Sequence, residues 1–561
     1  MPSLEIVQIV TYFVLLVVSV PLLGGYMARV YGGERTWLTP VLAPVERGIY
    51  WLSGVDPGEE MRWRGYTGAL LLFTLVGFAM LMLLQLLQFT LPLNPAQLPG
   101  VDPLLAFNSA TSFVTNTNWQ AYGGEVTMSY LTQMTGLAVQ NFVSAAAGMS
   151  VAIALIRGLA RHAASTVGNF WVDLVRSILY ILLPLSIVLA LILVSQGVVQ
   201  NVQPYVQATT LSGQSQLLPQ GPAASQVAIK QLGTNGGGFF NTNSAHPYEN
   251  PTPLSNFLEM FAILLIPAAL TYTYGKLVGS TRQGWAIFAA MLILFLLGLG
   301  AMAWAETSMT SFPNANMEGK EVRIGVLAST LWGAATTAAS NGSVNAMISS
   351  FSPLAGGIAL LFIMLGEVVF GGVGAGLYGM LMFAILTVFI AGLLVGRTPE
   401  LLGKKIEAHE VKMALLTLLL PAALILLFSA VAAVTDAALA SRGNLGPHGL
   451  SEILYAFASG AGNNGSAFAG LNANTPFYNL LVGVAMWIGR FGVILPVLSI
   501  AGSMARKEAT PPSAGTFPTD GPMFALLLTG VIIIVGALTF FPSLALGPLV
   551  EHLLMQSGRV F

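Results

Sequence analysis

Four short runs of Asn, Gly, Ser and Thr interrupt an otherwise strongly hydrophobic chain. They are TNTNW from Thr115, GTNGGG from Gly233, ASNGS from Ala339 and NNGS from Asn463. Their asparagines Asn116, Asn235, Asn341 and Asn464 recur at intervals of 119, 106 and 123 residues. Near-equal spacing of one motif indicates an internal fourfold repeat.

The residue types in these runs suit the binding of a dehydrated monovalent cation. Such an ion requires several oxygen ligands at once, and backbone carbonyls can supply them, assisted by Thr, Ser or Asn side chains. Glycine can adopt the positive φ that turns successive carbonyls toward one line. A short helix that points into the membrane also directs its negative end at the ion. One run alone would indicate an ordinary turn, but four equally spaced runs predict an ion pathway.

The composition determines the fold class. Hydrophobic residues make up 55% and charged residues 8% of the 561 residues, and the mean hydropathy is +0.76. A soluble protein carries about 25% charged residues. Because the apolar runs are about 20 residues long, we predict an all-α polytopic membrane protein and not a barrel. The net charge of −1 excludes a basic nucleic-acid-binding surface, and the lack of Cys excludes disulfides and thiolate chemistry.

Ten apolar stretches are long enough to be transmembrane helices. We expect them near residues 6–27, 68–88, 128–155, 174–194, 257–275, 284–304, 358–395, 412–434, 478–500 and 524–545. The first lacks a basic segment before it and is expected to be a retained span rather than a signal peptide. The seventh exceeds the required length and contains many glycines, so we expect it to be tilted or broken.

Between the first and last spans the pattern is span, pore-type loop, span, four times over. A short run that could form a half-helix precedes each polar segment, at 103–114, 221–232, 324–338 and 449–458. Helix starts are expected at Asp102-Pro103 and Pro447-His448, because Asp favours the cap and Pro the first turn. These re-entrant loops are possible in lipid only where protein encloses them.

Most of the 22 Lys and Arg residues lie in five connections that fall on one side of a ten-span topology. The positive-inside rule makes that side cytoplasmic. Both termini and the four pore loops are then expected to face outward.

Several other residues are candidates for a role near the pore. Glu367 lies inside the seventh span, where a carboxylate is costly and usually functional, and Arg490 in the ninth span is its expected counterpart. A purely structural buried pair is the alternative. Gly371 and Gly372 are candidate gate residues because glycine weakens the helix there. His246 and His448 have no partners at metal-ligand spacing and are expected to be structural or surface residues.

The chain resembles a known family in several stretches. They are TNTNWQAYGGE, IKQLGTNGGGFFNTNSAHPYENPTP, GEVVFGGVGAGLYGM, VGRTPELLGKK, NNGSAFAGL and GRFGVILP. These are similar to the potassium-binding A chain of the bacterial Kdp potassium-transporting P-type ATPase, over essentially the whole length. The resemblance implies a member of the superfamily of potassium transporters, with a pseudo-fourfold, potassium-channel-like pore.

The resemblance also implies the site residues. The selectivity filter would comprise Asn116, Thr117 and Asn118; Thr234, Asn235 and Gly236; Ser340, Asn341 and Gly342; and Asn463, Asn464 and Gly465. Gln120 matches a family position that influences potassium affinity. The first quarter departs from the others because Thr117-Asn118 stand where they have Asn-Gly, which puts strict fourfold coordination in doubt.

Energy for active transport would have to come from another chain. No phosphate-binding loop or soluble nucleotide domain is apparent, so no ATP hydrolysis and no bound nucleotide are expected here. The family implies the ligand potassium ion, the catalytic P-type ATPase chain KdpB, the smaller chains KdpC and KdpF, surrounding membrane lipid, and the bacterial cytoplasmic (inner) membrane. The ion would pass sideways toward the ATPase chain.

Two other functions are possible. The chain could be an autonomous, channel-like potassium uptake protein of the Trk or Ktr kind, which the extra first and last spans disfavour. It could also be a membrane enzyme that uses Glu367 and Arg490. The predicted organisation is a first helix and cytoplasmic loop at 1–66, pore repeats at 67–160, 161–280, 281–405 and 406–508, and a last helix with the C-terminus at 509–561.

Overall fold

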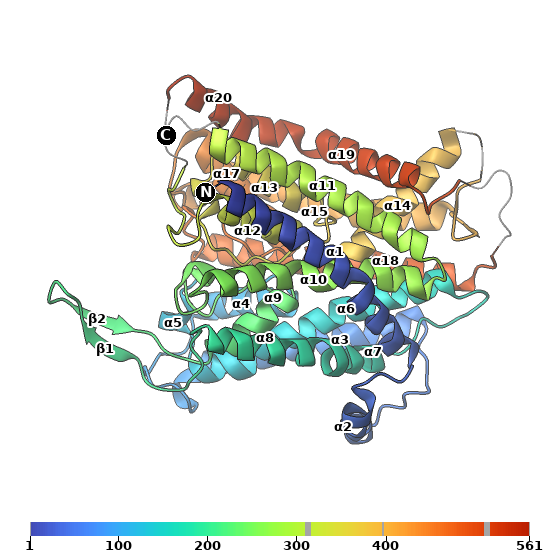
Figure 1. The fold of residues 1–561 in the computed structure, drawn as a ribbon, viewed down its shortest axis with the longest axis horizontal. Coiled ribbons are helices and arrows are strands. Elements are labelled where there is room, and N and C mark those ends of the chain that lie inside the picture. Colours follow the sequence, from blue (N-terminus) through green and yellow to red (C-terminus); the bar gives the residue numbers. More distant parts are fainter. Residues whose placement is uncertain (1, 309–315, 395, 397, 510–516, 560–561) are drawn as a thin grey trace.

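The computed structural model describes residues 2–308, 316–394, 396, 398–509 and 517–559. Among these residues, ten helices are long and apolar enough to cross a membrane, which confirms the predicted number. They run side by side along the long direction of the molecule (Figure 1). The strands found in the described part form two short antiparallel hairpins. The chain is therefore a helical bundle, as its composition predicted.

The spanning helices match the predicted stretches in order and position. They are α1 (Pro2–Gly32), α3 (Trp63–Leu87), α6 (Val139–Ala160), α7 with α8 (Phe170–Arg176 and Leu183–Ser195), α10 (Pro253–Leu277), α11 (Thr281–Ser308), α14 (Ala375–Leu394), α15 (Ala408–Ala433), α18 (Pro476–Arg506), and α19 with α20 (Pro522–Leu544 and Val550–Gln556). Segments of π-helix, Thr132–Ala138, Ser177–Leu182 and Ala545–Leu549, precede α6, join α7 to α8 and join α19 to α20.

Each of the four repeats contains one outer and one inner helix. In every repeat the helix after the polar loop is more buried than the helix before it. The inner helices α6, α10, α14 and α18 contact one another in the order α18–α6–α10–α14. The polar loops are therefore enclosed by protein, which satisfies the condition for irregular backbone at membrane depth.

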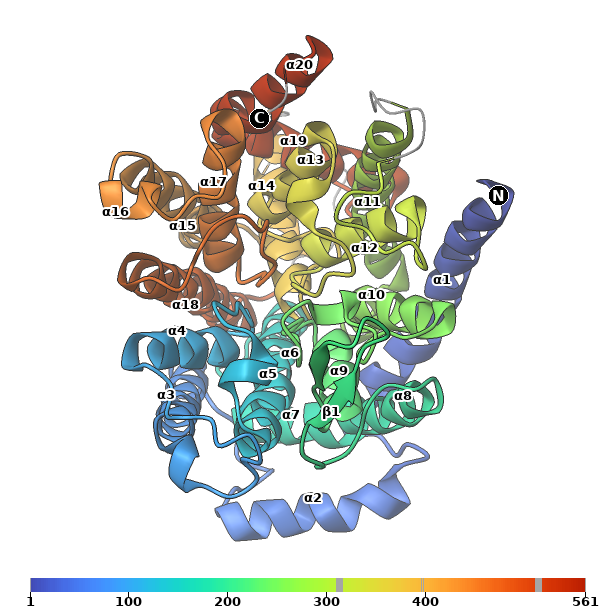
Figure 2. The ribbon, with the colours of Figure 1, turned by 90° about the vertical axis from the view of Figure 1, so that its left-hand side faces the viewer.

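Four short helices precede the polar loops, as the sequence predicted. They are α4 (Pro103–Val114), α9 (Ala223–Leu232), α12 (Val326–Ala338) and α17 (Gly446–Gly462). Viewed from the end of the bundle, they surround a common centre (Figure 2). The Asp102 carboxylate accepts hydrogen bonds from the backbone N–H groups of Leu104 and Leu105, which confirms the predicted cap of α4. Pro447 lies in the first turn of α17.

The seventh span is broken, as its length and glycine content suggested. A shorter helix, α13 (Pro353–Met364), is followed by an irregular segment, and α14 begins at Ala375. Glu367, Phe370 and three glycines of this segment have positive φ. The predicted last residue of the span, Val395, lies outside the described residues.

The remaining elements lie at the periphery. Helix α1 packs on α10, and α19 packs on α11, α13 and α14. The hairpin of β1 (Val206–Thr209) and β2 (Ser215–Leu218) projects from one end of the bundle, and α2 (Thr39–Ser53) lies across the other (Figures 1 and 2). Two short helices, α5 (Gly124–Thr127) and α16 (Asp436–Leu439), and a hairpin of β3 (Glu400–Leu401) with β4 (Lys404–Lys405) complete the connections. The described residues also contain three 3₁₀ turns, Gln88–Thr90, Asn243–Ala245 and Ile348–Ser350.

Candidate ion-selectivity filter

The four polar loops share one backbone conformation. The first residue of each predicted triplet has a φ of +48° to +64°, and the third has a φ of +54° to +92°. The first residues are Asn116, Thr234, Ser340 and Asn463, and the third residues are Asn118, Gly236, Gly342 and Gly465. The middle residues do not have positive φ. Such alternation is the backbone pattern expected of a strand that turns successive carbonyl groups toward one side, as ion coordination requires.

The loops are anchored in the same way to their pore helices. The backbone N–H of each middle residue donates to the carbonyl oxygen five residues earlier, over 2.8 to 3.1 Å. The pairs are Thr117 with Ser112, Asn235 with Lys230, Asn341 with Thr336, and Asn464 with Ser459. The repeat seen in the sequence is therefore a repeat of geometry.

This geometry corrects the alignment of the four asparagines whose spacing indicated the repeat. Asn116 has the conformation of Thr234 and not that of Asn235. The equivalent of Asn235, Asn341 and Asn464 in the first quarter is Thr117, as the hydrogen bonds to the pore helices show. The triplets themselves are in register.

The four strands approach one another closely. A Cβ atom on Gly236, Gly342 or Gly465 would come within 2.5 Å or less of a carbonyl oxygen of the next strand, on Asn341, Asn464 and Thr117 respectively. Such a distance is well inside van der Waals contact. The strands thus follow one another in the order two, three, four, one around a centre.

Side chains also join neighbouring quarters of the filter. The Asn116 amide donates to the Thr234 carbonyl oxygen (3.1 Å), and the Ser340 hydroxyl donates to that of Asn463 (2.9 Å). The Asn463 amide donates to the Thr117 hydroxyl (2.9 Å), which joins the fourth quarter to the first. These bonds tie the backbones of neighbouring quarters together.

The first quarter departs in residue type but not in conformation. Asn118 stands where the other quarters have glycine, yet it adopts the same left-handed backbone, with φ +54°. Asparagine tolerates this region better than most residues. Its amide donates to the Asn141 side-chain oxygen over 2.6 Å. The predicted irregularity therefore does not disturb the backbone of the ring.

Gln120 joins the loops of the first two quarters. Its side-chain amide donates to the Gly238 carbonyl oxygen (2.9 Å), and its oxygen accepts from the Gly238 N–H (2.8 Å). Gln120 also lines a cavity of about 310 Å³ with residues of the fourth repeat, among them Glu452 and Asn472. This cavity forms a vestibule beside the filter.

The candidate gate residues lie against the opposite end of the filter. A Cβ on Gly372 would be 3.3 Å from the Ser340 side chain and 3.5 Å from the Thr234 hydroxyl. Gly371 has φ +68°, and its N–H donates to the Ala338 carbonyl oxygen over 3.2 Å. The broken segment of the seventh span thus contacts the second and third quarters.

Glu367 and Arg490 line one cavity of about 80 Å³ next to this end of the filter, together with Asn463. Both side chains are buried. The ion pairs of the described residues do not include a direct contact between them, and Glu367 Oε1 has no hydrogen-bond partner there. The two side chains therefore line a shared space, and they do not form the direct buried pair that was the structural alternative.

The two histidines have structural contacts. The His246 ring stacks on Phe240 at 4.3 Å between centroids, and burial lowers its pKa. His448 Nδ1 lies 2.7 Å from the Glu551 carboxylate, which links α17 to α20. No group of three or more metal-ligating residues is found in the described part of the chain.

Polar groups that were not predicted from the sequence lie behind the second quarter. Lys230, in α9, is fully buried and contacts Glu249 and Asn243, and Asn243 contacts Gly236. A visible signal was available, since Lys230 is a charged residue inside an apolar half-helix. Its partners, 13 and 19 residues further on, could not be identified without the fold.

Comparisons with known proteins agree on one family. The family model described as potassium-transporting ATPase A subunit matches residues 10–553. The potassium-transporting ATPase potassium-binding subunit of Methylorubrum extorquens is 59% identical over 560 residues, covering 99% of this chain and 98% of the relative. That of Rhodospirillum centenum is 60% identical over 564 residues, with the same coverage.

A solved structure shares the fold. The potassium transporter TrkH from Vibrio parahaemolyticus aligns with a TM-score of 0.53 over 88% of this chain and 98% of its own, at 14% identity. At this identity the likeness concerns the fold alone, and it agrees with the four pore repeats. The match of the family model and the identity to full-length relatives show that the chain belongs to the family of potassium-transporting ATPase A subunits.

Proposed function

We propose that the twelve residues of the four triplets form a potassium-selectivity filter, and that the chain binds external potassium there and passes it on within an ATP-driven uptake complex. The observation that carries this proposal is the fourfold recurrence of one strand conformation around a common centre. Four such strands offer rings of carbonyl oxygens in place of the water around the ion. Family membership supports potassium as the ion.

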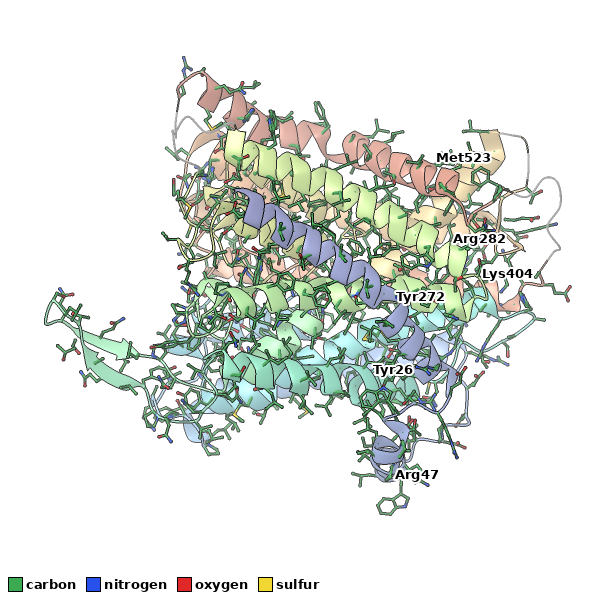
Figure 3. All side chains as sticks on the ribbon, in the orientation of Figure 1. Tyr26, Arg47, Tyr272, Arg282, Lys404 and Met523 are labelled. Carbon is green, nitrogen blue, oxygen red and sulfur yellow. The ribbon has the colours of Figure 1, made fainter. Side chains whose placement is uncertain are left out.

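The proposed orientation in the membrane is based on the distribution of charge. Arg47, Arg282 and Lys404 lie at one end of the bundle (Figure 3), and the hairpin of β1 and β2 lies at the other (Figure 1). The positive-inside rule assigns the basic end to the cytoplasm. The vestibule beside Gln120, the start of α1 and helix α20 then face outward, in a bacterial inner membrane with the lipid around the outer helices.

The route beyond the filter is proposed to run sideways. The cavity that holds Glu367 and Arg490 reaches from Asn463 to residues of α15 and α19, among them Ile425 and Phe540. Both helices lie outside the inner four, so the cavity extends from the filter toward the periphery. This direction supports delivery to the catalytic P-type chain KdpB, with KdpC and KdpF completing the complex. Gly371 and Gly372, which lie against the second and third quarters of the filter, would act as the gate.

A potassium-stimulated ATPase assay on the purified complex tests this proposal. We expect ATP hydrolysis by the catalytic partner to depend on potassium, and Gly236→Asp to abolish that dependence by placing a bulky anion in the filter. Hydrolysis indifferent to potassium and to the substitution would overturn the proposal.

The fold shared with TrkH favours one alternative, an autonomous channel-like protein. Electrical recording from the isolated chain in a bilayer separates the two. A steady ohmic potassium current would support the channel, whereas transport only in the presence of the partner and ATP supports a component of a pump. The predicted repeat boundaries at residues 67, 161, 281 and 406 stay a prediction.

A further inference from the structure

In three quarters of the filter, the pore-helix residue that anchors the filter strand is uncharged. In the second quarter this residue carries a charge. The pore-helix residue that accepts the N–H of the middle filter residue is Ser112, Thr336 or Ser459 in quarters one, three and four. In the second quarter it is Lys230, whose side chain has no exposed surface. A buried ammonium costs free energy unless it is paired, so its retention at this position calls for an explanation.

The three hydroxyl residues form hydrogen bonds inside their own quarters. The Ser112 hydroxyl donates to the Trp119 carbonyl oxygen over 2.8 Å, and the Ser459 hydroxyl accepts from the Gly465 N–H over 2.9 Å. The Thr336 hydroxyl donates weakly to the Asn341 side-chain oxygen over 3.4 Å. These contacts fix the loop without bringing a charge near the ion.

Lys230 instead begins a chain of contacts that ends on a filter carbonyl. Its ammonium forms an ion pair with the buried Glu249 carboxylate and donates to the Asn243 side-chain oxygen over 2.7 Å. The Asn243 amide nitrogen then donates to the Gly236 carbonyl oxygen over 2.8 Å. The Glu249 carboxylate also accepts a hydrogen bond from the Phe240 N–H over 2.8 Å. We call Glu249, Lys230 and Asn243 the relay.

The relay distinguishes one carbonyl from its three equivalents. Among the hydrogen bonds of the described residues, none ends on the carbonyl oxygens of Asn118, Gly342 or Gly465, whereas Gly236 accepts one. A carbonyl oxygen has two lone pairs, so the bond leaves one for an ion. Because an ammonium polarises the amide that donates, this hydrogen bond draws more electron density than a neutral one.

We infer that the relay is a specificity-determining device, which weakens the Gly236 carbonyl as a ligand and fixes its direction. Lys230 and Asn243 are positioning residues that act on the ion through Gly236. The inference deepens the proposed filter and rests on it. Selectivity for potassium over sodium depends on the number and field strength of coordinating carbonyls. A weaker ligand field disfavours the smaller sodium ion more than potassium, because the smaller ion gains more from strong ligands.

The backbone of Lys230 also contacts the filter strands directly. Its carbonyl oxygen accepts the N–H groups of Asn235 (2.8 Å) and Gly236 (3.0 Å), and the Asn341 amide of the third quarter (3.1 Å). Lys230 therefore anchors the second filter strand and joins it to the third. Through Asn243 it also polarises the Gly236 carbonyl.

A matched pair of double variants tests the inference. Lys230→Met with Glu249→Gln removes both charges of the relay and keeps the side-chain volumes similar. Lys320→Met with Glu306→Gln makes the same change in another buried pair, 2.9 Å apart and also without exposed side-chain surface. Lys320 packs over the Phe351 ring, and neither Lys320 nor Glu306 bonds to a filter carbonyl. Replacing a buried ion pair by neutral residues usually preserves folding.

The readout is the potassium-over-sodium selectivity ratio, which is the half-stimulating sodium concentration divided by the half-stimulating potassium concentration, for ATP hydrolysis by the purified complex. We expect the relay variant to lower potassium-over-sodium selectivity by about three- to tenfold. This factor corresponds to the free energy of one polarised hydrogen bond. The Lys320 control should stay near the wild-type ratio. Asn243→Gly, which suits the φ of +56° and removes the Asn243 side chain while keeping Lys230 and Glu249, should lower the ratio too. The Asn243→Gly variant also tests the inference if the complex with the double variant does not assemble.

Wild-type selectivity in both Asn243→Gly and the relay variant would overturn the inference, and so would an equal loss in the Lys320 control. A wild-type complex without any potassium stimulation would instead contradict the proposed function, so the two failures are distinguishable.

Discussion

Gly236 lies so close to Asn341 that a Cβ atom on the glycine would overlap the asparagine carbonyl oxygen. The contact joins the second and third quarters of the filter. Gly236 also has φ +77°, a conformation that favours glycine. Two independent constraints, one steric and one conformational, therefore act on the same residue.

Gly236→Ala should impair potassium binding far more than backbone strain alone would. A residue other than glycine at this φ costs about 1–2 kcal/mol, and the methyl group must also displace a filter carbonyl. We expect the apparent potassium affinity of the complex to fall at least about tenfold. Half-stimulating potassium concentrations for ATP hydrolysis measure this effect.

Gly213→Ala is the matched control, because Gly213 has φ +80° in the exposed turn between β1 and β2, and nothing lies within 4 Å of its Cβ position. It should leave potassium affinity unchanged. Equal losses of affinity in the two variants would show that strain alone accounts for the effect, and that the contact with Asn341 does not matter.

Asn118→Ala tests why the first quarter can do without glycine. The change removes the 2.6 Å hydrogen bond to Asn141 and places alanine at φ +54°. Asn118→Gly removes the same bond but relieves the backbone. We expect alanine to lower potassium affinity several-fold more than glycine, by about 1 kcal/mol. If glycine is as harmful as alanine, the hydrogen bond and not the conformation is decisive.

The sequence predicted those features that depend on local composition. Spans such as α10 follow from apolar length, and the α4 helix follows from Asp102 and Pro103, because caps and hydropathy are properties of neighbouring residues. The break before Ala375 was also expected, since glycines cluster there.

Relations between distant residues could not be predicted. The Glu367 and Arg490 charges suggested a direct pair, but the fold sets them on the wall of a cavity. The relay from Lys230 needs Asn243 and Glu249, which only the folded loop brings behind the filter. The sequence also could not show which asparagines are structurally equivalent. Asn116 was grouped with Asn235, but its conformation is that of Thr234.

Glu367→Gln should slow transport without changing what the filter selects. The carboxylate lies in the cavity beyond the filter, and its Oε1 is buried without a partner among the described residues, so a passing cation is its natural counter-charge. We expect potassium transport by the complex to fall about tenfold, with the ratio of potassium to sodium affinities unchanged. Tyr378→Phe, a similar-sized change in the same wall, is the control. Wild-type transport in Glu367→Gln would remove Glu367 from the pathway.

Lys404→Met should loosen the basic end of the bundle. The fully buried ammonium donates to the carbonyl oxygens of Gly158 (3.0 Å) and Met504 (2.8 Å), and also to that of Arg161. These carbonyls lie near the C-terminal ends of α6 and α18, where a cation is stabilising.

Removing this donor takes away the ammonium hydrogen bond from all three buried carbonyls, of which Met504 keeps the bond from the Lys507 N–H, and we expect a cost of about 2 kcal/mol. Thermal unfolding of the purified chain should show the loss. Lys405→Met, in the adjacent and exposed position of the same hairpin, should leave the melting temperature close to wild type. A Lys404→Met protein as stable as Lys405→Met would mean that water replaces the ammonium without penalty.

The contact between His448 and Glu551 should make stability depend on pH. Burial lowers the pKa of His448, but the hydrogen bond to Glu551 and the negative charge of that carboxylate raise it more, so that the pKa lies above its usual value. A raised folded-state pKa contributes stability that is fully present below about pH 6.5, the unfolded value, and is lost as the pH rises through the folded value.

Glu551→Gln should therefore destabilise the protein by about 0.5–1 kcal/mol at pH 6 and by much less at pH 9. Melting temperatures of wild type and variant across this range measure the difference. Glu318→Gln provides the comparison, because Glu318 is exposed and influences His448 only through its charge. It should produce a smaller shift at pH 6. A gap between wild type and Glu551→Gln that stays constant from pH 6 to pH 9 would show that the pair is held by packing and not by the charge on the imidazole.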